Sequence, residues 1–139
     1  IPHATLFMHD ESGYNYRMPN INAAVGCAQL EKLSEYVDKK RMIAARYKEA
    51  FASLNGVKFF SEPSYARSNY WLNTLLLDHG DVKKRDDIIS AAAARDMMMR
   101  PVWSLMHTLK MYAEMPRMDL SCSEDLQRRI INIPSGVQL

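Results

Sequence analysis

The sequence lacks every short motif that marks a self-contained catalytic site. In its 139 residues there is no P-loop, no GxGxxG, no HExxH, no CxxC pair and no GxSxG. It also lacks a large charge of one sign, because 18 basic and 16 acidic residues leave a net charge of only +2. These absences give no reason to expect a nucleic-acid or membrane partner.

Long apolar runs and a secretory signal are absent too, so we expect a cytoplasmic protein. Cysteine is scarce. Cys27 and Cys122 have neither metal-ligand spacing nor the density of a disulfide scaffold, which favours reduced thiols.

What is present is a globular composition, 47% hydrophobic and 24% charged, in a chain long enough for one domain with a core. The chain begins "IPHATLF" without methionine, which is consistent with a piece of a longer protein.

A long helical region is predicted from Asn20, with Pro19 at its entrance and Asn20 as a possible cap. Apolar residues recur at helical spacing to a stop signal at Asn55–Gly56, with a bend expected near Ser34. The first turns are rich in small residues. Gly26 in mid-helix indicates close packing, either inside the domain or against another subunit. The basic cluster "KKR" at 39–41 is expected to be a solvated face, with Lys39 and Lys40 facing water, and not a binding patch.

The rest of the chain alternates short strands and helices. The predicted elements are strands at Val57–Phe60, Ser68–Asp78 and Met97–Pro101, helices at Asp81–Met97 (capped by Asp81) and from Ser121 or Ser123 to Arg129, and a final extended segment "IINIPSG". This order predicts an α+β fold with a short, largely antiparallel sheet and helices on one side.

Two places could carry chemistry. Asn15 and Arg17 stand before the long helix, where amide and guanidinium donors suit an anion; on spacing alone, a turn and a surface ion pair are favoured instead. Among the four histidines, His107 stands out because it lies in an apolar, aromatic loop after Trp103. A partly buried imidazole there is a candidate for acid–base work or phosphate binding.

Five segments resemble, in order, the C-terminal domain of the DegT/DnrJ/EryC1/StrS sugar aminotransferases. They are "HDESGYNYRMPNINAAVGCAQLEKL", "KKRMIAARYKEAF", "SNYWLNTLLL", "RPVWSLMHTLKMY" and "RRIINIPSG". The pair "YNYRMPNINAA" and "RPVWSLMH" is most similar to the branch that acts on UDP-linked 4-keto-6-deoxy amino sugars. The resemblance implies the small C-terminal domain of the fold type I pyridoxal-phosphate enzymes.

The resemblance also implies a reaction and a site. Such enzymes move an amino group from glutamate to a nucleotide-linked keto sugar, at an active site on the interface of a homodimer. Residues 1–19 would reach the neighbouring subunit, where Asn15 and Arg17 would meet the cofactor phosphate or the substrate. Residues 20–139 would form the small domain, and His107 and Trp103 would contact the substrate.

One departure from the family is large. The domain that carries the cofactor-binding lysine is absent, and none of the eight lysines matches its position. The chain by itself is therefore expected to be inactive. Two alternatives stay open: a non-catalytic interaction domain of the same fold, and a related sugar dehydratase that uses pyridoxamine phosphate.

Overall fold

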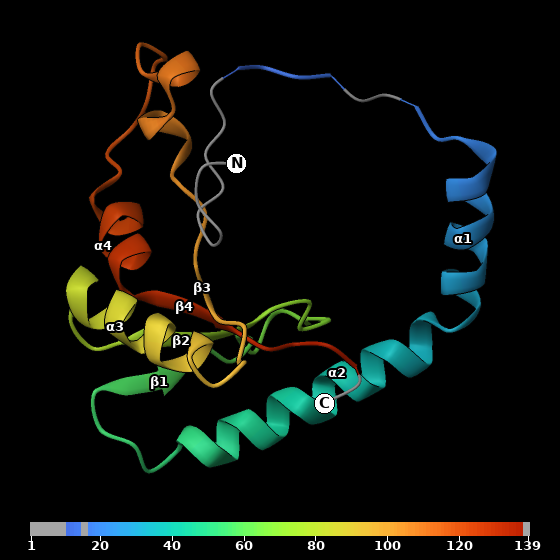
Figure 1. Cartoon of the computed structure of the whole chain (residues 1–139), viewed down its shortest axis with the longest axis horizontal. Coiled ribbons are helices and arrows are strands. Elements are labelled where there is room, and N and C mark those ends of the chain that lie inside the picture. The colour runs from blue at the N-terminus through green and yellow to red at the C-terminus, as the bar shows by residue number, and fades with distance from the viewer. Residues whose placement is uncertain (1–10, 15–16, 138–139) are drawn as a thin grey trace.

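The structure is a computed structural model that describes residues 11–14 and 17–137 (Figure 1). Its elements, in chain order, are α1 (Asn20–Glu31), α2 (Leu33–Phe51), β1 (Val57–Phe59), β2 (Asn73–Leu77), α3 (Val82–Ala93), β3 (Arg100–Pro101), the 3₁₀ turns η1 (Met106–Thr108) and η2 (Lys110–Tyr112), α4 (Ser121–Arg129) and β4 (Ile130–Ile133). The predicted α+β class is confirmed.

The four strands form one antiparallel sheet in the order β1-β2-β4-β3. The last strand of the chain therefore lies inside the sheet, between β2 and β3. Leu75 on β2 is opposite Ile131 on β4, and Asn73 is opposite Ile133. Because side chains alternate along a strand, these odd-numbered residues share one face of the sheet.

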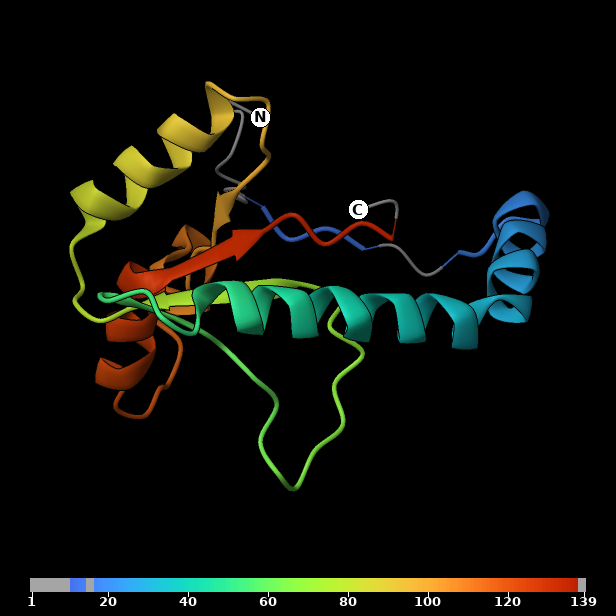
Figure 2. The ribbon, with the colours of Figure 1, turned by 90° about the horizontal axis from the view of Figure 1, so that it is seen from below.

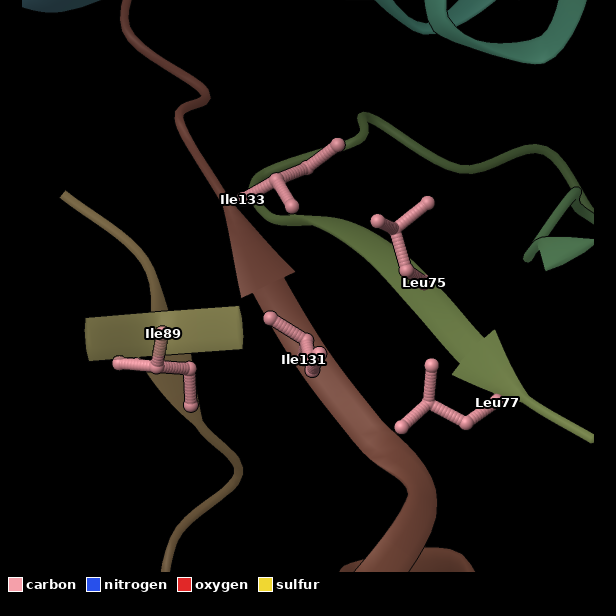
Figure 3. Packing of buried hydrophobic residues seen from close by; sticks show 5 residues of the cluster. All are labelled: Leu75, Leu77, Ile89, Ile131 and Ile133. Atoms are coloured by element: carbon pink, nitrogen blue, oxygen red, sulfur yellow. The ribbon is translucent and has the colours of Figure 1, made fainter. Parts of the chain in front are cut away.

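That face carries the core (Figure 3). The buried cluster consists of Leu75, Leu77, Ile89, Ile131 and Ile133. Ile89 comes from α3, while Tyr47 and Phe51 of α2 pack against the same cluster. Both helices thus cover one face of the sheet, as the sequence predicted. Burying the apolar side chains of this cluster stabilises the fold by roughly 25 cal/mol for each Å² of apolar surface removed from water.

Helix α1 lies apart from this core. It begins at Asn20 as predicted, with Pro19 at the N-cap and no side-chain cap, and it breaks from α2 at Lys32 rather than at Ser34. None of its residues is buried, and in both ribbon views it projects away from the sheet (Figures 1 and 2). A Cβ added at Gly26 would meet nothing within 4 Å. The described residues therefore provide no tight intramolecular contact there.

Several predicted boundaries were wrong. The strand expected from Ser68 begins only at Asn73, because side-chain hydrogen bonds fold the preceding residues into a loop. Tyr70 in that loop has a φ of 47°, outside the strand region. Helix α3 is capped by the Asp81 carboxylate, which accepts from the Lys84 N–H, but it ends at Ala93 instead of Met97.

The cap of the last helix was also predicted incorrectly. The N-cap of α4 is Leu120, with no side-chain hydrogen bond, and neither Ser121 nor Ser123 has that role. Instead, the Asp119 carboxylate accepts from the Ser121 N–H and hydroxyl. These bonds lower the pKa of Asp119, the hydroxyl bond contributing most.

Among the described residues, no helix is both long enough and apolar enough to cross a membrane.

Candidate functional site

The structure places three of the four predicted site residues, and they lie in different parts of the fold. Asn15 lies outside the described residues. Arg17 is exposed in the segment that enters α1 and makes no hydrogen bond or ion pair with residues 11–14 or 17–137. Trp103 lies between β3 and η1, and His107 is in η1. In Figure 1 the η1–η2 region and α1 are on opposite sides of the molecule, so Arg17 and His107 do not share a pocket within this chain.

The surface ion pair that the sequence favoured for Arg17 is thus not present in the described part of the chain. A planar fork of donors such as this guanidinium matches a phosphate or carboxylate.

Trp103 stacks on Trp71, a residue that the sequence analysis treated only as part of a strand. The ring centroids are 6.1 Å apart and the planes differ by 20°. Both side chains remain open to solvent, Trp71 at 63% and Trp103 at 49% exposure. These are the only two tryptophans in the 139 residues. An exposed, stacked pair is a surface on which a flat ligand can lie.

Both polar main-chain groups of Trp71, the N–H and the carbonyl, are hydrogen-bonded. Its N–H donates to Asn69 Oδ1 at 3.0 Å, and its carbonyl accepts from Lys40 Nζ at 3.1 Å. The same ammonium donates to the Ser135 carbonyl at 2.8 Å. Burial lowers the pKa of Lys40. The prediction that Lys40 faces water was therefore wrong: its nitrogen ties α2 to the residues before β2 and after β4.

Arg41 anchors the same loop one residue further along α2. Its guanidinium donates to both carboxylate oxygens of Glu62, at 2.6 and 3.0 Å, and to the Ser68 carbonyl at 2.6 Å. It also lies 5.6 Å from the centroid of the Tyr70 ring, in a cation–π arrangement. The Arg41 hydrogen bond, helped by the Ser68 N–H, lowers the pKa of Glu62 to about 2. This network fixes the loop that presents Trp71.

A groove runs beside Trp71 across the ends of β4 and β3. Polar groups in its lining include Asp96, Arg100, Asn132 and Ser135. Asn132 Oδ1 accepts from the Thr74 hydroxyl at 3.1 Å, which leaves its amide N–H groups as donors. The groove thus combines an aromatic wall with both donors and acceptors, the composition typical of small-molecule sites.

His107 lies in a second, smaller pocket of about 290 Å³. Its Nε2 is 3.1 Å from a Glu124 carboxylate oxygen, and only 16% of its side chain is exposed. Apolar side chains dominate the lining, among them Leu105, Met106 and Leu120, with Arg117 and Ser123 as polar members. His107 and Trp103 therefore belong to neighbouring but separate surfaces. The ring is positioned by Glu124, a contact that sequence spacing does not reveal.

The described residues contain no group of three or more His, Cys, Asp or Glu side chains that could hold a metal ion.

Comparison with known proteins covers nearly the whole chain. The DegT/DnrJ/EryC1/StrS aminotransferase family matches residues 3–139. The "Putative pyridoxal phosphate-dependent aminotransferase EpsN" of Bacillus subtilis (strain 168) is 42% identical, over 96% of this chain and 35% of that protein. The GDP-perosamine synthase of Escherichia coli O157:H7 is 37% identical, over 93% of this chain and 34% of that enzyme.

Solved structures agree on the fold. DesI, crystallised in the presence of its TDP-sugar product, has a TM-score of 0.76 at 26% identity, covering 85% of this chain and 31% of that chain. Helicobacter pylori PseC, an aminotransferase involved in pseudoaminic acid biosynthesis, has a TM-score of 0.79 at 19% identity, covering 99% of this chain and 39% of that one. The chain spans about a third of the length of the curated relatives it matches. It belongs to the DegT/DnrJ/EryC1/StrS aminotransferase family.

Proposed function

We propose that this chain is the C-terminal part of a pyridoxal-phosphate-dependent aminotransferase that moves an amino group from glutamate to a 4-keto-6-deoxy nucleotide sugar. The observation that carries the proposal is the family match over residues 3–139, supported by one relative named as a pyridoxal phosphate-dependent aminotransferase and another named as a GDP-perosamine synthase. Residues 20–139 are then the small domain, and residues 1–19 are the segment that reaches another subunit.

The cofactor would be held mainly by residues outside this chain. Pyridoxal phosphate supplies an electron sink when it is bound through a lysine. Lys40 has a lowered pKa, but its nitrogen donates to two carbonyls, which does not suit covalent attachment. Lys39 and Lys83 are tied to acidic side chains on exposed helix faces. These three lysines thus do not fit covalent attachment of the cofactor.

Arg17 fits a supporting role. Its exposed guanidinium, unpaired among the described residues, could bind a phosphate that another subunit holds. Asn15 would add amide donors to the same anion. Since the segment entering α1 lies across the molecule from the region of η1, which contains His107 (Figure 1), a site that uses both residues requires two copies of the chain. A homodimer meets that requirement.

His107 and Trp103 would contact the nucleotide sugar. Glu124 binds Nε2 of His107, which leaves Nδ1 to face a ligand. In this arrangement the carboxylate orients the ring and sets which nitrogen carries the proton. Trp103 would offer an apolar face on the neighbouring surface.

The activity is tested in the longer protein that contains this chain. The purified protein is incubated with ¹⁵N-glutamate and UDP-, GDP- or TDP-linked 4-keto-6-deoxy sugars, and the sugar product is analysed by mass spectrometry. We expect ¹⁵N in the amino sugar from at least one nucleotide. Loss of a sugar hydroxyl without ¹⁵N incorporation would indicate the dehydratase, and no change in any sugar would indicate the non-catalytic domain.

The shared anion site is tested separately. Asn15→Ala and Arg17→Ala should each lower the amount of pyridoxal phosphate that remains bound after gel filtration, measured by cofactor absorbance. Arg95→Ala is the matched control, because Arg95 is exposed, lies just after α3 and directs its guanidinium to the Ala91 carbonyl of that helix. Equal cofactor content in all variants would contradict the proposed role of residues 15 and 17.

A further inference from the structure

We propose that Trp71, together with Trp103, forms the stacking surface for the base of the bound nucleotide. The class of ligand rests on the proposed function, whereas the surface and the residue that completes it come from the structure. Trp71 reaches the site from the loop before β2, and Trp103 from the segment after β3.

The geometry suits a planar ring. The two indoles lie 6.1 Å apart at 20°, so they form an offset stack in which each covers only part of the other. With 63% of Trp71 and 49% of Trp103 exposed, indole surface remains for a third ring to continue the stack. Base–aromatic stacking tolerates any base because every base has a π-face.

The exposed indole of Trp71 is attached to an immobilised backbone. Its N–H and carbonyl are both hydrogen-bonded, and the Arg41–Glu62 pair fixes the loop before it. Tyr70, directly preceding it, is held at a φ of 47°, a conformation that a bulky residue rarely adopts. Such a backbone fixes the point from which the ring extends, and stacking on Trp103 restricts the ring itself, which reduces the entropy lost when a ligand binds.

Polar groups flank the aromatic surface on the side where a nucleotide would extend. Arg100 on β3 and Asn132 on β4 line the groove next to Trp71. A guanidinium can bind diphosphate oxygens in a bidentate manner. Asn132 and Asp96, in the same groove, offer a donor and an acceptor to the edge of a base.

Nucleotide binding by the longer protein tests the proposal without the sugar or the amino donor. UDP, GDP and TDP are titrated by calorimetry, and the tightest binder is used as the probe. Trp71→Ala should weaken its Kd by about tenfold to a hundredfold, the range of base–aromatic stacking. Trp71→Phe should retain most of the affinity, and Trp71→Leu, apolar but without a π-face, should behave like the alanine variant.

Two controls isolate stacking. Tyr65→Ala removes an aromatic ring that is 89% exposed in the same loop, and it should leave the Kd unchanged. Inorganic pyrophosphate, which has no base, should bind wild type and Trp71→Ala equally. Thermal melting of each variant confirms that it is folded.

Several results would overturn the proposal. They are an unchanged nucleotide Kd in Trp71→Ala, full affinity in Trp71→Leu, equal weakening of pyrophosphate, or no binding of any of the three nucleotides to wild type. Weakened binding of the nucleotide sugar with an unchanged Kd for the nucleotide would assign Trp71 to the sugar instead.

The inference and the proposed function can fail independently. A protein that transfers the amino group but binds nucleotide equally well without Trp71 contradicts only the inference. A protein that binds nucleotide through Trp71 but transfers no amino group contradicts only the proposed function.

Discussion

At the scale of single residues, the environment of Glu62 gives a pH-dependent contribution to stability. The Arg41 side chain is the main cause that lowers its pKa from 4.5 to about 2. A carboxylate with a lowered folded-state pKa stabilises the fold above its unfolded pKa, and this contribution is lost as the pH falls through the folded value. The stabilising effect of Glu62 should therefore be fully present above about pH 4.5 and disappear toward pH 2.

Glu62→Gln tests this window. In urea denaturation of the 139-residue chain, the variant should be less stable than wild type at pH 6, and the difference should shrink between about pH 4.5 and pH 2. Glu49→Gln, on an exposed position of α2, should match wild type throughout. A difference for Glu62→Gln that stays constant across this range would show that the ion pair with Arg41 has no part in it.

The fully buried Ile131 shows the effect of burial on a single side chain. Ile131 is 0% exposed in the core cluster, whereas Ile21 on α1 is 77% exposed. Ile131→Ala should lower the free energy of unfolding by about 2–5 kcal/mol, because it removes buried methyl groups and leaves a cavity. Ile21→Ala should change it by less than about 0.5 kcal/mol. Similar values from denaturant melts of the two variants would refute the core assignment.

At the scale of elements, the start of α3 depends on one carboxylate. Asp81 Oδ1 accepts from the Lys84 N–H at 3.0 Å, one of the donors that a helix start leaves without a partner. Asp81→Ala should destabilise the fold by about 1 kcal/mol. Asp87→Ala on the same helix removes only the exposed pair with Lys83 and should cost about 0.3–0.5 kcal/mol. Thermal or urea melts of both variants compare the two, and equal losses would mean that the cap does not stabilise α3.

Elements with a strong local signal could be predicted from the sequence. The start of α1 at Asn20, the strand at Val57 and the Asp81 cap all follow from short-range chemistry. The loop at Ser68–Leu72 could not be predicted from the sequence. Tyr70 and Trp71 favour a strand locally, whereas hydrogen bonds from distant residues impose a loop. Arg41 is 27 residues from Ser68, and Lys40 is 31 residues from Trp71.

The candidate site was likewise predictable only where local sequence or a family motif marks a residue. Arg17, Trp103 and His107 could be selected because they stand in unusual local surroundings or match a family motif. Trp71 could not, since its pairing with Trp103 is visible only once the sheet order is known. The contact between His107 and Glu124, 17 residues apart, depends on how η1 packs near α4.

At the scale of the whole molecule, α1 leaves apolar surface uncovered. Ile21, Val25 and Leu30 are 57–77% exposed and lie on a helix that no other element buries (Figure 2). Exposed apolar patches promote association. The 139-residue chain should therefore self-associate, with a mass by light scattering that rises with concentration.

Introducing charged side chains on α1 tests whether its exposed apolar residues cause the self-association. The double variant Ile21→Glu and Val25→Glu should shift the chain toward a monomer, while Lys48→Glu, on an exposed position of α2, should not. A monomer at high concentration for the unmodified chain would contradict the prediction.

The position of β4 also has a consequence for the order of events during synthesis. Leu75 and Leu77 reach the ribosome exit long before Ile131, yet β4 is the strand that joins the β1–β2 hairpin to β3. The nascent polypeptide cannot complete this part of its core until β4 emerges. A chaperone that shields apolar segments during translation would act in that interval, and premature termination before Ile130 would leave a product whose core lacks Ile131 and Ile133.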